Sequence, residues 1–447
     1  MPGSPMDRHL PDWRSHVTLA LCTVLHAFTH AYGTMLVPLY LLIVADLRLG
    51  GVRAAAMIVA VYGLVNFSFS YAAGVLADRF DRKVLLGVGL LVNAAAVVAI
   101  GMTRRYEWIV ALAVVAGLAA SVFHPAANAL VPAHYPRSPG MAIGLLGIGS
   151  GLGFFVGPQY AGWRAEAATW SWSHVAQWQK PCVELGAVGL VCGALFLLLA
   201  RETPRPATAD RAAPPPDEAS PLVVHRRPLG LSLRWRTTAV AFALALRDFA
   251  GVATVTLVSV FLQRAHGRSV KEAGLVVGTM MLSGVIANPL AVYWSPGVRR
   301  LKALVAVLVF GGAVLATVPW LAARYTLPVL FVFYGMQLGS YAISDAAMLE
   351  RVDNAVRGRV VGLFLSIAGT IGAAGPWAMG AWTDHVATAG RATDPLAYAP
   401  AFATVGALMA LASVAAPLLA RLGKPGSGTP PTPLSETMPA TVGPVGG

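Results

Sequence analysis

The sequence contains few charged residues. Lys, Arg, Asp and Glu make up 12% of its 447 residues, about half of the roughly 25% found in soluble globular proteins. Hydrophobic residues make up 56%, and the mean hydropathy is +0.65. This composition excludes an ordinary soluble protein and leaves no room for a large soluble domain.

Cysteine is scarce, and nucleotide-binding motifs are missing. The cysteines are Cys22, Cys182 and Cys192, and no two have metal-ligand spacing, so neither a disulfide framework nor a zinc site is indicated. The sequence has no Walker loop and no glycine-rich turn after a strand, which argues against ATP-driven pumping by this chain. We expect a protein that is not an enzyme and that binds no cofactor or metal.

The chain has instead a series of long apolar runs. Each is about 20 residues or longer, the length that spans a bilayer as an α-helix. None alternates as a barrel strand does, and the first run is too long for a signal peptide. The predicted spans are 17–45, 52–77, 84–102, 108–132, 140–163, 182–200, 237–262, 273–294, 303–323, 327–350, 360–383 and 398–420.

These twelve runs predict an all-α membrane protein made of two six-helix bundles, at 17–200 and 237–420. Residues 1–16 form a polar N-terminus. The segment 201–236 contains a proline run and several arginines, a composition that cannot bury enough apolar surface to fold alone. It is predicted to be a cytoplasmic linker, and 421–447 a disordered cytoplasmic tail.

The net charge is +13 and the sequence pI is about 10.0, which in a soluble protein would suggest nucleic-acid binding. Here Lys and Arg lie between the apolar runs, roughly 21 on the side of the N-terminus and roughly 11 on the other. We therefore expect both termini in the cytoplasm of a bacterium, an inner-membrane location and no nucleic-acid partner. Four tryptophans are expected at the outer membrane boundary: Trp163, Trp170, Trp172 and Trp178.

The two halves carry an internal repeat. Adding 218 to a residue number superposes the fifth span on the eleventh, and the same shift sets Gly117 on Gly335 and Arg82 on Arg300. Parallel copies of one unit place a substrate site at mid-membrane between them. The coincidences in the fifth span are Gly140, Gly144, Gly157, Pro158 and Gly162, which fall on Gly358, Gly362, Gly375, Pro376 and Gly380.

The loop between the second and third spans reads Gly74-Val-Leu-Ala-Asp78-Arg79-Phe-Asp81-Arg82-Lys83. It resembles the signature loop of the major facilitator superfamily, Gly-x-Leu-Ala-Asp-Arg-x-Gly-Arg-Arg/Lys. The resemblance implies a transporter fold of twelve helices and a cytoplasmic gating role for Gly74, Asp78, Arg79, Arg82 and Lys83. Asp81 departs from the pattern, because it replaces the usual glycine.

In the fifth span, Gly144, Gly153, Gly157-Pro158 and Gly162 resemble the spacing of a motif of drug–proton antiporters, with Ala161 in place of one glycine. The resemblance implies export. Small residues let helices approach closely and proline can bend a helix, so we expect packing and kinking roles here and at Gly375 and Pro376. Generic packing is the alternative interpretation.

Proton-coupled relatives often carry an arginine in the fourth span, where this sequence has Ala113. Ionisable groups within spans are costly and usually face a cavity or a partner. His26 and His30 lie four residues apart and share a helical face, as do His124 and Asn128. The run Phe123-His124-Pro125 resembles one in the fosmidomycin-resistance branch of the superfamily.

The second half offers Arg247 and Asp248 in the seventh span, and the 218 shift sets Asp248 on His30. A face of the tenth span carries Gln337, Tyr341 and Asp345. Histidine titrates near neutral pH, and burial favours the neutral form of a carboxyl group. We hypothesise that Asp248 or Asp345, with His30, carries a proton, while Arg247 holds an anionic substrate or neutralises Asp248. The alternative is a structural ion pair.

The leading hypothesis is a proton-coupled exporter of small organic molecules, working as a monomer in the lipid bilayer by alternating access. An importer of an anionic nutrient on the same fold is the nearest alternative. A more distant one is an intramembrane metal or haem protein with His26, His30 and His124 as ligands. A sensor would usually carry a folded soluble domain, which the sequence does not indicate.

Overall fold

The structure is a computed structural model that describes residues 12–167, 175–202 and 230–423. Every regular element in these ranges is helical, and twelve segments are long and apolar enough to cross a membrane. The first six are α1 (Trp13–Thr34) continued by η2 (Val37–Leu39) and α2 (Tyr40–Asp46), α3 (Val52–Arg79), α4 (Arg82–Met102), α5 (Tyr106–Ser121) continued by α6 (Phe123–His134), α7 (Pro139–Glu166) and α8 (Gln179–Leu199).

The second six repeat this arrangement. They are α9 (Leu231–Arg264), α10 (Val270–Trp294), η3 (Gly297–Arg299) with α11 (Arg300–Ala316) and η4 (Val318–Trp320), α12 (Ala323–Leu349), α13 (Asn354–Gly372) with α14 (Gly375–Thr388), and η5 (Pro395–Tyr398) with α15 (Ala399–Leu411), η6 (Ala412–Val414) and α16 (Ala415–Ala420).

The predicted fold class is confirmed, and each predicted span coincides with one of the twelve segments. The largest differences in a boundary are at α9, which begins at Leu231 rather than at residue 237, and at α13, which begins at Asn354 rather than at residue 360. Several predictions lie outside the described residues: most of the linker (203–229), the tail from 424, residues 1–11, and Trp170 and Trp172.

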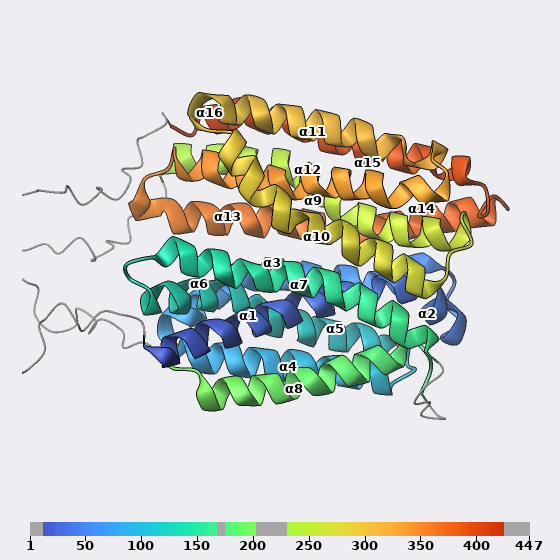
Figure 1. The fold of residues 1–447 in the computed structure, drawn as a ribbon, viewed down its shortest axis with the longest axis horizontal. Coiled ribbons are helices and arrows are strands. Elements are labelled where there is room, and N and C mark those ends of the chain that lie inside the picture. Colours follow the sequence, from blue (N-terminus) through green and yellow to red (C-terminus); the bar gives the residue numbers. More distant parts are fainter. Residues whose placement is uncertain (1–11, 168–174, 203–229, 424–447) are drawn as a thin grey trace, which may run out of the picture.

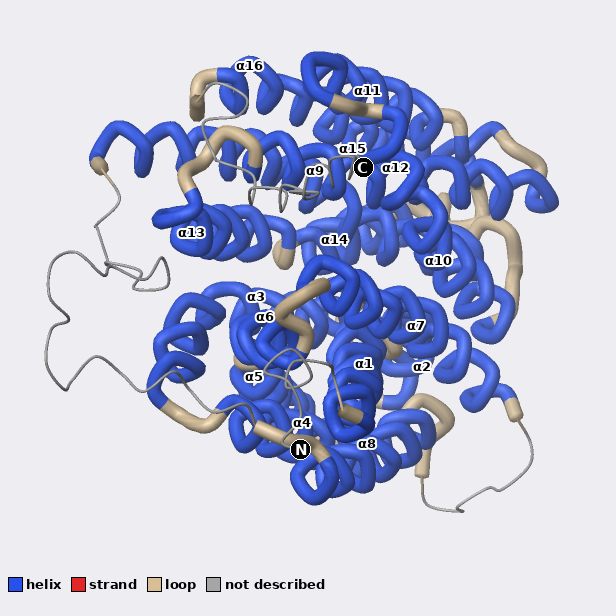
Figure 2. The backbone as a smooth tube through the Cα atoms, turned by 60° about the vertical axis from the view of Figure 1, so that its left-hand side comes forward, coloured by secondary structure: helices blue, strands red, loops and turns tan. Residues whose placement is uncertain are grey.

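The two halves form separate bundles, with α1–α8 below and α9–α16 above in Figure 2. Helix pairing is the same in both. In the first half α1 packs on α7, α4 on α8 and α3 on α5, and in the second half α9 packs on α13, α11 on α15 and α10 on α12. Identical pairing is what a duplicated unit predicts, because the same apolar faces meet in each copy.

The bundles contact each other mainly through α7 with α10 and through α3 with α13 and α14. We call the end of the molecule that carries Trp13, Arg79 and Leu199 the termini end, and the opposite end, which carries α2, the far end; they lie on the left and right of Figure 1. The interface therefore runs along the helices, from one end to the other.

Proline interrupts some helices and not others. The break between α5 and α6 lies at Val122, because Pro125 has no N–H to donate to the Ser121 carbonyl. The break leaves Phe123 and His124 at the start of α6. Pro158, in contrast, lies inside α7, which remains one helix, whereas its repeat partner Pro376 follows the break between α13 and α14.

Trp178 lies at the start of α8. It is fully buried, and its Nε1 donates a hydrogen bond to Asp46 Oδ2 at 3.0 Å. Trp163 is 46% exposed. The position of both at the membrane boundary stays a prediction, because it concerns depth in the bilayer and not burial in the protein. A buried tryptophan needs a partner for its N–H, and Asp46 supplies it from another segment of the same bundle.

Three of the predicted packing glycines of α7 allow close approach of another helix. A Cβ at Gly157 would lie 2.8 Å from Ala31 Cα, and Gly153 meets the Ala27 backbone in the same way, so both fit against α1. Gly162 meets Lys271 of α10, in the other bundle. Gly144 differs: a Cβ there would meet nothing within 4 Å, so this conformation shows no packing role for it.

We predict that Gly157→Val destabilises the protein and that Gly144→Val does not. The valine at 157 would push α7 away from α1, and overpacking of this kind typically costs about 1–3 kcal/mol. The measurement is the thermal unfolding midpoint of each purified variant in detergent. Equal midpoints for the two variants would contradict the packing described here.

Candidate functional site

Two groups of polar side chains lie near the middle of the spans, one in each half. The first, which we call the histidine cluster, consists of His26 and His30 of α1 and His124 of α6. The second, the arginine cluster, consists of Arg247 and Asp248 of α9 with Tyr341 and Ser344 of α12. All of these residues except Ser344 were singled out as candidates in the sequence.

The histidine cluster is held by one backbone contact. His26 Nδ1 lies 2.8 Å from the Leu146 carbonyl oxygen of α7. A carbonyl only accepts, so Nδ1 carries the proton, and in the neutral ring Nε2 has a free lone pair. His30 Nε2 lies 3.1 Å from His26 Nε2, and His30 is therefore the donor in that hydrogen bond.

Aromatic rings enclose the three imidazoles. His26 stacks on Phe123 with 4.7 Å between ring centroids, and His30 lies 4.2 Å from Phe154. The His124 ring is 5.2 Å from His26 and 5.7 Å from His30. His26 is buried, while His30 and His124 are partly exposed and Asn128, one turn beyond His124, is exposed. The cluster therefore opens on the side of His30 and His124.

The arginine cluster is a closed ion pair. Arg247 Nε and Nη2 lie 2.9 and 2.8 Å from Asp248 Oδ1, and Nη1 donates to Ser344 Oγ at 2.8 Å. The guanidinium carbon lies 3.6 Å from the centroid of the Tyr341 ring, within the range of a cation–π interaction. Arg247 is fully buried, so in this conformation it neutralises Asp248 and has no free face for an anion.

Two further candidates flank the arginine cluster. Gln337 is buried and its Nε2 donates to the Arg247 carbonyl at 2.8 Å, which positions α9 against α12. Asp345 has an exposed side chain although it sits inside a membrane span and within electrostatic reach of Arg247 and Asp248. Ionisable groups within spans usually face a cavity or a partner, and Arg247 and Asp248 are the charged neighbours of Asp345.

The two clusters occupy equivalent places in the repeat. Asp248 corresponds to His30, and Tyr341 corresponds to Phe123, at the fixed shift of 218. Asp248 packs against Gly372 as His30 packs against Phe154, the equivalent of Gly372. One half thus has imidazoles, and the other a charged pair, at the same site of the unit.

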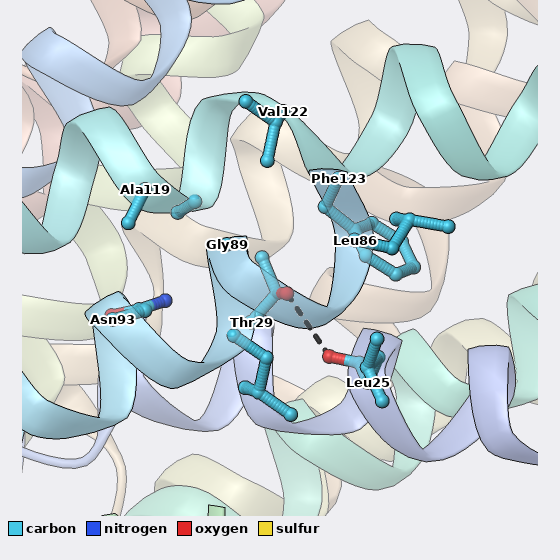
Figure 3. A pocket seen from close by; sticks show the side chains of 10 residues that line it. Leu25, Thr29, Leu86, Gly89, Asn93, Ala119, Val122 and Phe123 are labelled. Carbon is cyan, nitrogen blue, oxygen red and sulfur yellow. Dashed lines mark hydrogen bonds between the residues drawn. The ribbon is translucent and has the colours of Figure 1, made fainter. Parts of the chain in front are cut away.

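A small cavity inside the first bundle does not belong to this site. It lies between α1, α4 and the α5–α6 break, and is lined mostly by apolar side chains with Asn93 and Thr29 (Figure 3). Thr29 Oγ1 donates to the Leu25 carbonyl at 3.0 Å. The space is about that of one water molecule, too small for an organic substrate.

The signature loop lies at the termini end. Asp78 and Arg79 are exposed at the end of α3, and Arg82 Nη1 donates to the Ala129 carbonyl at 3.4 Å. Asp81, the departure from the family pattern, is the N-cap of α4 and accepts from the Val84 N–H at 2.8 Å.

The ends of the signature loop differ in how they are held. Lys83 N donates to Glu202 Oε2 at 2.7 Å, and burial raises the pKa of the Glu202 carboxyl. This contact ties the start of α4 to the chain after α8. Gly74, at the other end, leaves room for a Cβ, whose nearest neighbour would be Pro125 at 3.9 Å. Close approach of a neighbouring helix at Gly74 is therefore not seen here.

Two carboxylates at the far end were not among the sequence candidates. Asp384 accepts from the N–H groups of Val52 and Arg53, at 2.7 and 2.9 Å, and so caps α3 from the other bundle. Glu166 accepts from the Lys271 N–H at 2.9 Å and does the same for α10. We call Glu166 and Asp384 the far-end carboxylates.

The far-end carboxylates are repeat partners, and so are Arg53 and Lys271. The shift of 218 could have found them, had it been applied to charged residues at span ends. α3 has no side-chain cap of its own, so Asp384 satisfies N–H groups that would otherwise lack a partner. A carboxylate is also stabilised at the positive end of the helix dipole.

Comparison with known proteins agrees with this architecture. The family model of the Major Facilitator Superfamily matches residues 19–376. The chain is 28% identical over 329 residues to an MFS-type transporter of Mycobacterium tuberculosis (strain CDC 1551 / Oshkosh), covering 70% of this chain and 67% of the relative.

Two other relatives have named activities. The chain is 32% identical over 143 residues to the multidrug resistance protein MdtG of Yersinia enterocolitica, covering 31% of this chain and 34% of that protein. It is 24% identical over 389 residues to the hexuronate transporter of Bacillus subtilis (strain 168), covering 82% and 86%.

Among solved structures, a bacterial homologue of the human lysosomal transporter Spinster, in an inward-facing and occupied conformation, superposes with a TM-score of 0.68. The two share 18% identity and cover 92% and 97% of their chains, a likeness that concerns the fold. The described residues contain twelve helical segments long and apolar enough to cross a membrane, in two equivalent bundles. With a family match over most of its length, the chain belongs to the major facilitator superfamily and is a multi-pass membrane transporter, not an enzyme.

Proposed function

We propose that this transporter exports small organic molecules in exchange for protons, by alternating access, across the inner membrane of a bacterium. The observation that carries the proposal is the pair of polar clusters at equivalent mid-span positions, with Asp345 accessible beside them. The fifth-span glycines and the partial likeness to a multidrug resistance protein favour export. One chain contains both bundles, so we propose that the monomer is the working unit.

The proposed orientation follows from charge. The termini end carries the signature loop with Arg79, Arg82 and Lys83, and the arginine-rich segment 201–236 connects two spans at this end. Loops rich in Lys and Arg stay in the cytoplasm. The termini end is then cytoplasmic and the far end faces the outside.

Alternating access requires the bundles to separate at one end at a time. The far-end carboxylates join the bundles at the outer face by hydrogen bonds to helix N-termini, and Gly380 lets α14 approach Arg53 of α3, with 2.8 Å between a Cβ placed on it and the Arg53 Cα. These contacts must break before the outer side opens. They would therefore stabilise the outward-closed state.

We predict that Asp384→Asn, and likewise Glu166→Gln, shifts the equilibrium toward outward-open states. Hydrogen bonds to a charged group contribute about 1.5–3 kcal/mol, and about 1.4 kcal/mol is tenfold in an equilibrium. The reporter is Ala56→Cys in a variant without the three native cysteines. Ala56 is buried at the far end, where α3 packs on α14. A membrane-impermeant maleimide can label a cysteine there only when the bundles separate at this end. We expect labelling to be about tenfold faster.

Asp394→Asn is the matched control, because Asp394 is an exposed far-end carboxylate paired with Arg391 of its own bundle. Its labelling rate should equal that of the parent. If Asp384→Asn and Glu166→Gln also leave the rate unchanged, the far-end carboxylates do not hold the outer side closed.

Proton coupling is assigned to Asp345, with Asp248 and His30 as the other candidates. Asp345→Asn removes an accessible titratable group while keeping its size. We expect substrate-driven proton flux in reconstituted vesicles to fall strongly, because carboxylates within spans carry protons in pumps and transporters. Substrate binding should persist. Unchanged coupling in both Asp345→Asn and Asp248→Asn would exclude the two carboxylates as carriers.

Import of an anionic nutrient is the second candidate, favoured by the likeness to a hexuronate transporter over most of the chain. The direction of transport can be decided in inside-out vesicles whose lumen is more acidic than the surrounding medium. An exporter of the proposed kind accumulates its substrate in the lumen of such vesicles, whereas an importer coupled to protons depletes it. A drug-sensitivity and metabolite-export profile of a strain with and without the gene supplies the substrates to test.

A further inference from the structure

The histidine cluster has the geometry of a metal site. One ring nitrogen from each of His26, His30 and His124 can be chosen so that all three lie within 4.8 Å of one another. The Nε2 atoms of His26 and His30 are 3.1 Å apart. Ligands of a tetrahedral zinc ion at Zn–N of about 2.0–2.1 Å are separated by about 3.3 Å, so this pair already has the spacing of two ligands.

The protonation pattern also suits a metal. The Leu146 carbonyl holds the proton of His26 on Nδ1 and leaves Nε2 free to coordinate. Metal-binding histidines usually donate their other N–H to a carbonyl or carboxylate, which fixes the ring and its tautomer. In His30, transfer of the proton from Nε2 to Nδ1 would free the second ligand without changing the net charge of the ring.

The three imidazoles and their neighbours favour one class of metal ion. Three neutral imidazoles match Zn²⁺, Co²⁺, Ni²⁺ and Cu²⁺, whereas Mg²⁺ and Ca²⁺ require oxygen ligands. Phe123 stacks on the His26 ring, and Phe154 lies against the His30 ring. His30 and His124 are partly exposed, so a fourth position remains open, as in three-histidine zinc sites that keep a place for water or a ligand.

We propose that His26, His30 and His124 bind one divalent transition-metal ion of the zinc class, with an open coordination position on the partly exposed side of His30 and His124. A doubly charged ion within a membrane is costly unless water or an anionic donor reaches it, and the open position provides that access. An oxygen or nitrogen donor of a small molecule can then complete the coordination. This binding does not depend on the direction of transport or on proton coupling.

Cobalt is the probe, because four-coordinate Co²⁺ with nitrogen ligands absorbs visible light and Zn²⁺ does not. Purified full-length protein, prepared with an affinity tag that contains no histidine, is titrated with Co²⁺ and then with Zn²⁺. We expect a saturable visible band at one Co²⁺ per chain, which Zn²⁺ abolishes. Absence of the band in the parent protein would overturn the proposal.

Variants locate the site. His30→Asn and His124→Asn should each weaken Co²⁺ binding at least about tenfold, since even loss of a supporting partner of a ligand costs 10- to 100-fold. His385→Asn, in an exposed histidine of α14, is the control and should bind as the parent does. Equal affinity in all three variants would place the metal elsewhere and contradict the proposal.

A second measurement avoids the risk that a variant fails to fold. Diethyl pyrocarbonate modifies accessible imidazoles in the unaltered chain, and mass spectrometry reports which ones. Zn²⁺ should protect His30 and His124 and leave His385 reactive. Equal modification of His30 and His124 with and without Zn²⁺ would overturn the assignment even if Co²⁺ binds.

Discussion

The structure depends on the cost of an unsatisfied polar group in lipid. Within the hydrocarbon core no water is available, so backbone groups must bond within helices and charged side chains must find partners inside the protein. Arg247 shows the consequence, because its guanidinium is fully buried and bonded to Asp248 and Ser344. The same constraint explains why the two polar clusters lie between helices at mid-span.

The two duplicated bundles meet this constraint with different side chains. The two bundles pair their helices identically, yet the equivalent mid-span position carries a neutral imidazole in one half and a charged pair in the other. The far-end contacts remain symmetric, since Glu166 and Asp384 each cap a helix of the opposite bundle. The side chains at mid-span therefore differ between the halves, while the far-end contacts are the same. Such an arrangement suits two bundles that move in the same way but bind different chemical groups.

Much of the fold could be predicted from the sequence because its signals are local and strong. Twelve apolar runs give twelve spans, and the repeat of Gly157-Pro158 at Gly375-Pro376 indicates the duplication. The local consequence of proline was harder to predict, since Pro158 leaves α7 continuous while a helix break precedes Pro376. Whether a proline breaks a helix depends on whether neighbouring helices satisfy and support the freed carbonyl.

The candidate site could be predicted only as a set of residue types. Sequence spacing placed His26 and His30 on one helical face, but only the tertiary structure brought His124 of another helix beside them and set the Leu146 carbonyl against His26. It also decided that Arg247 is bound to its neighbour and that Asp345 is accessible.

What the sequence by itself determined is the class of protein, since hydrophobic length and loop charge act through the membrane and need no partner residue. Only the tertiary structure decided which polar groups meet, because contacts between helices depend on how their faces pack and not on their distance along the chain.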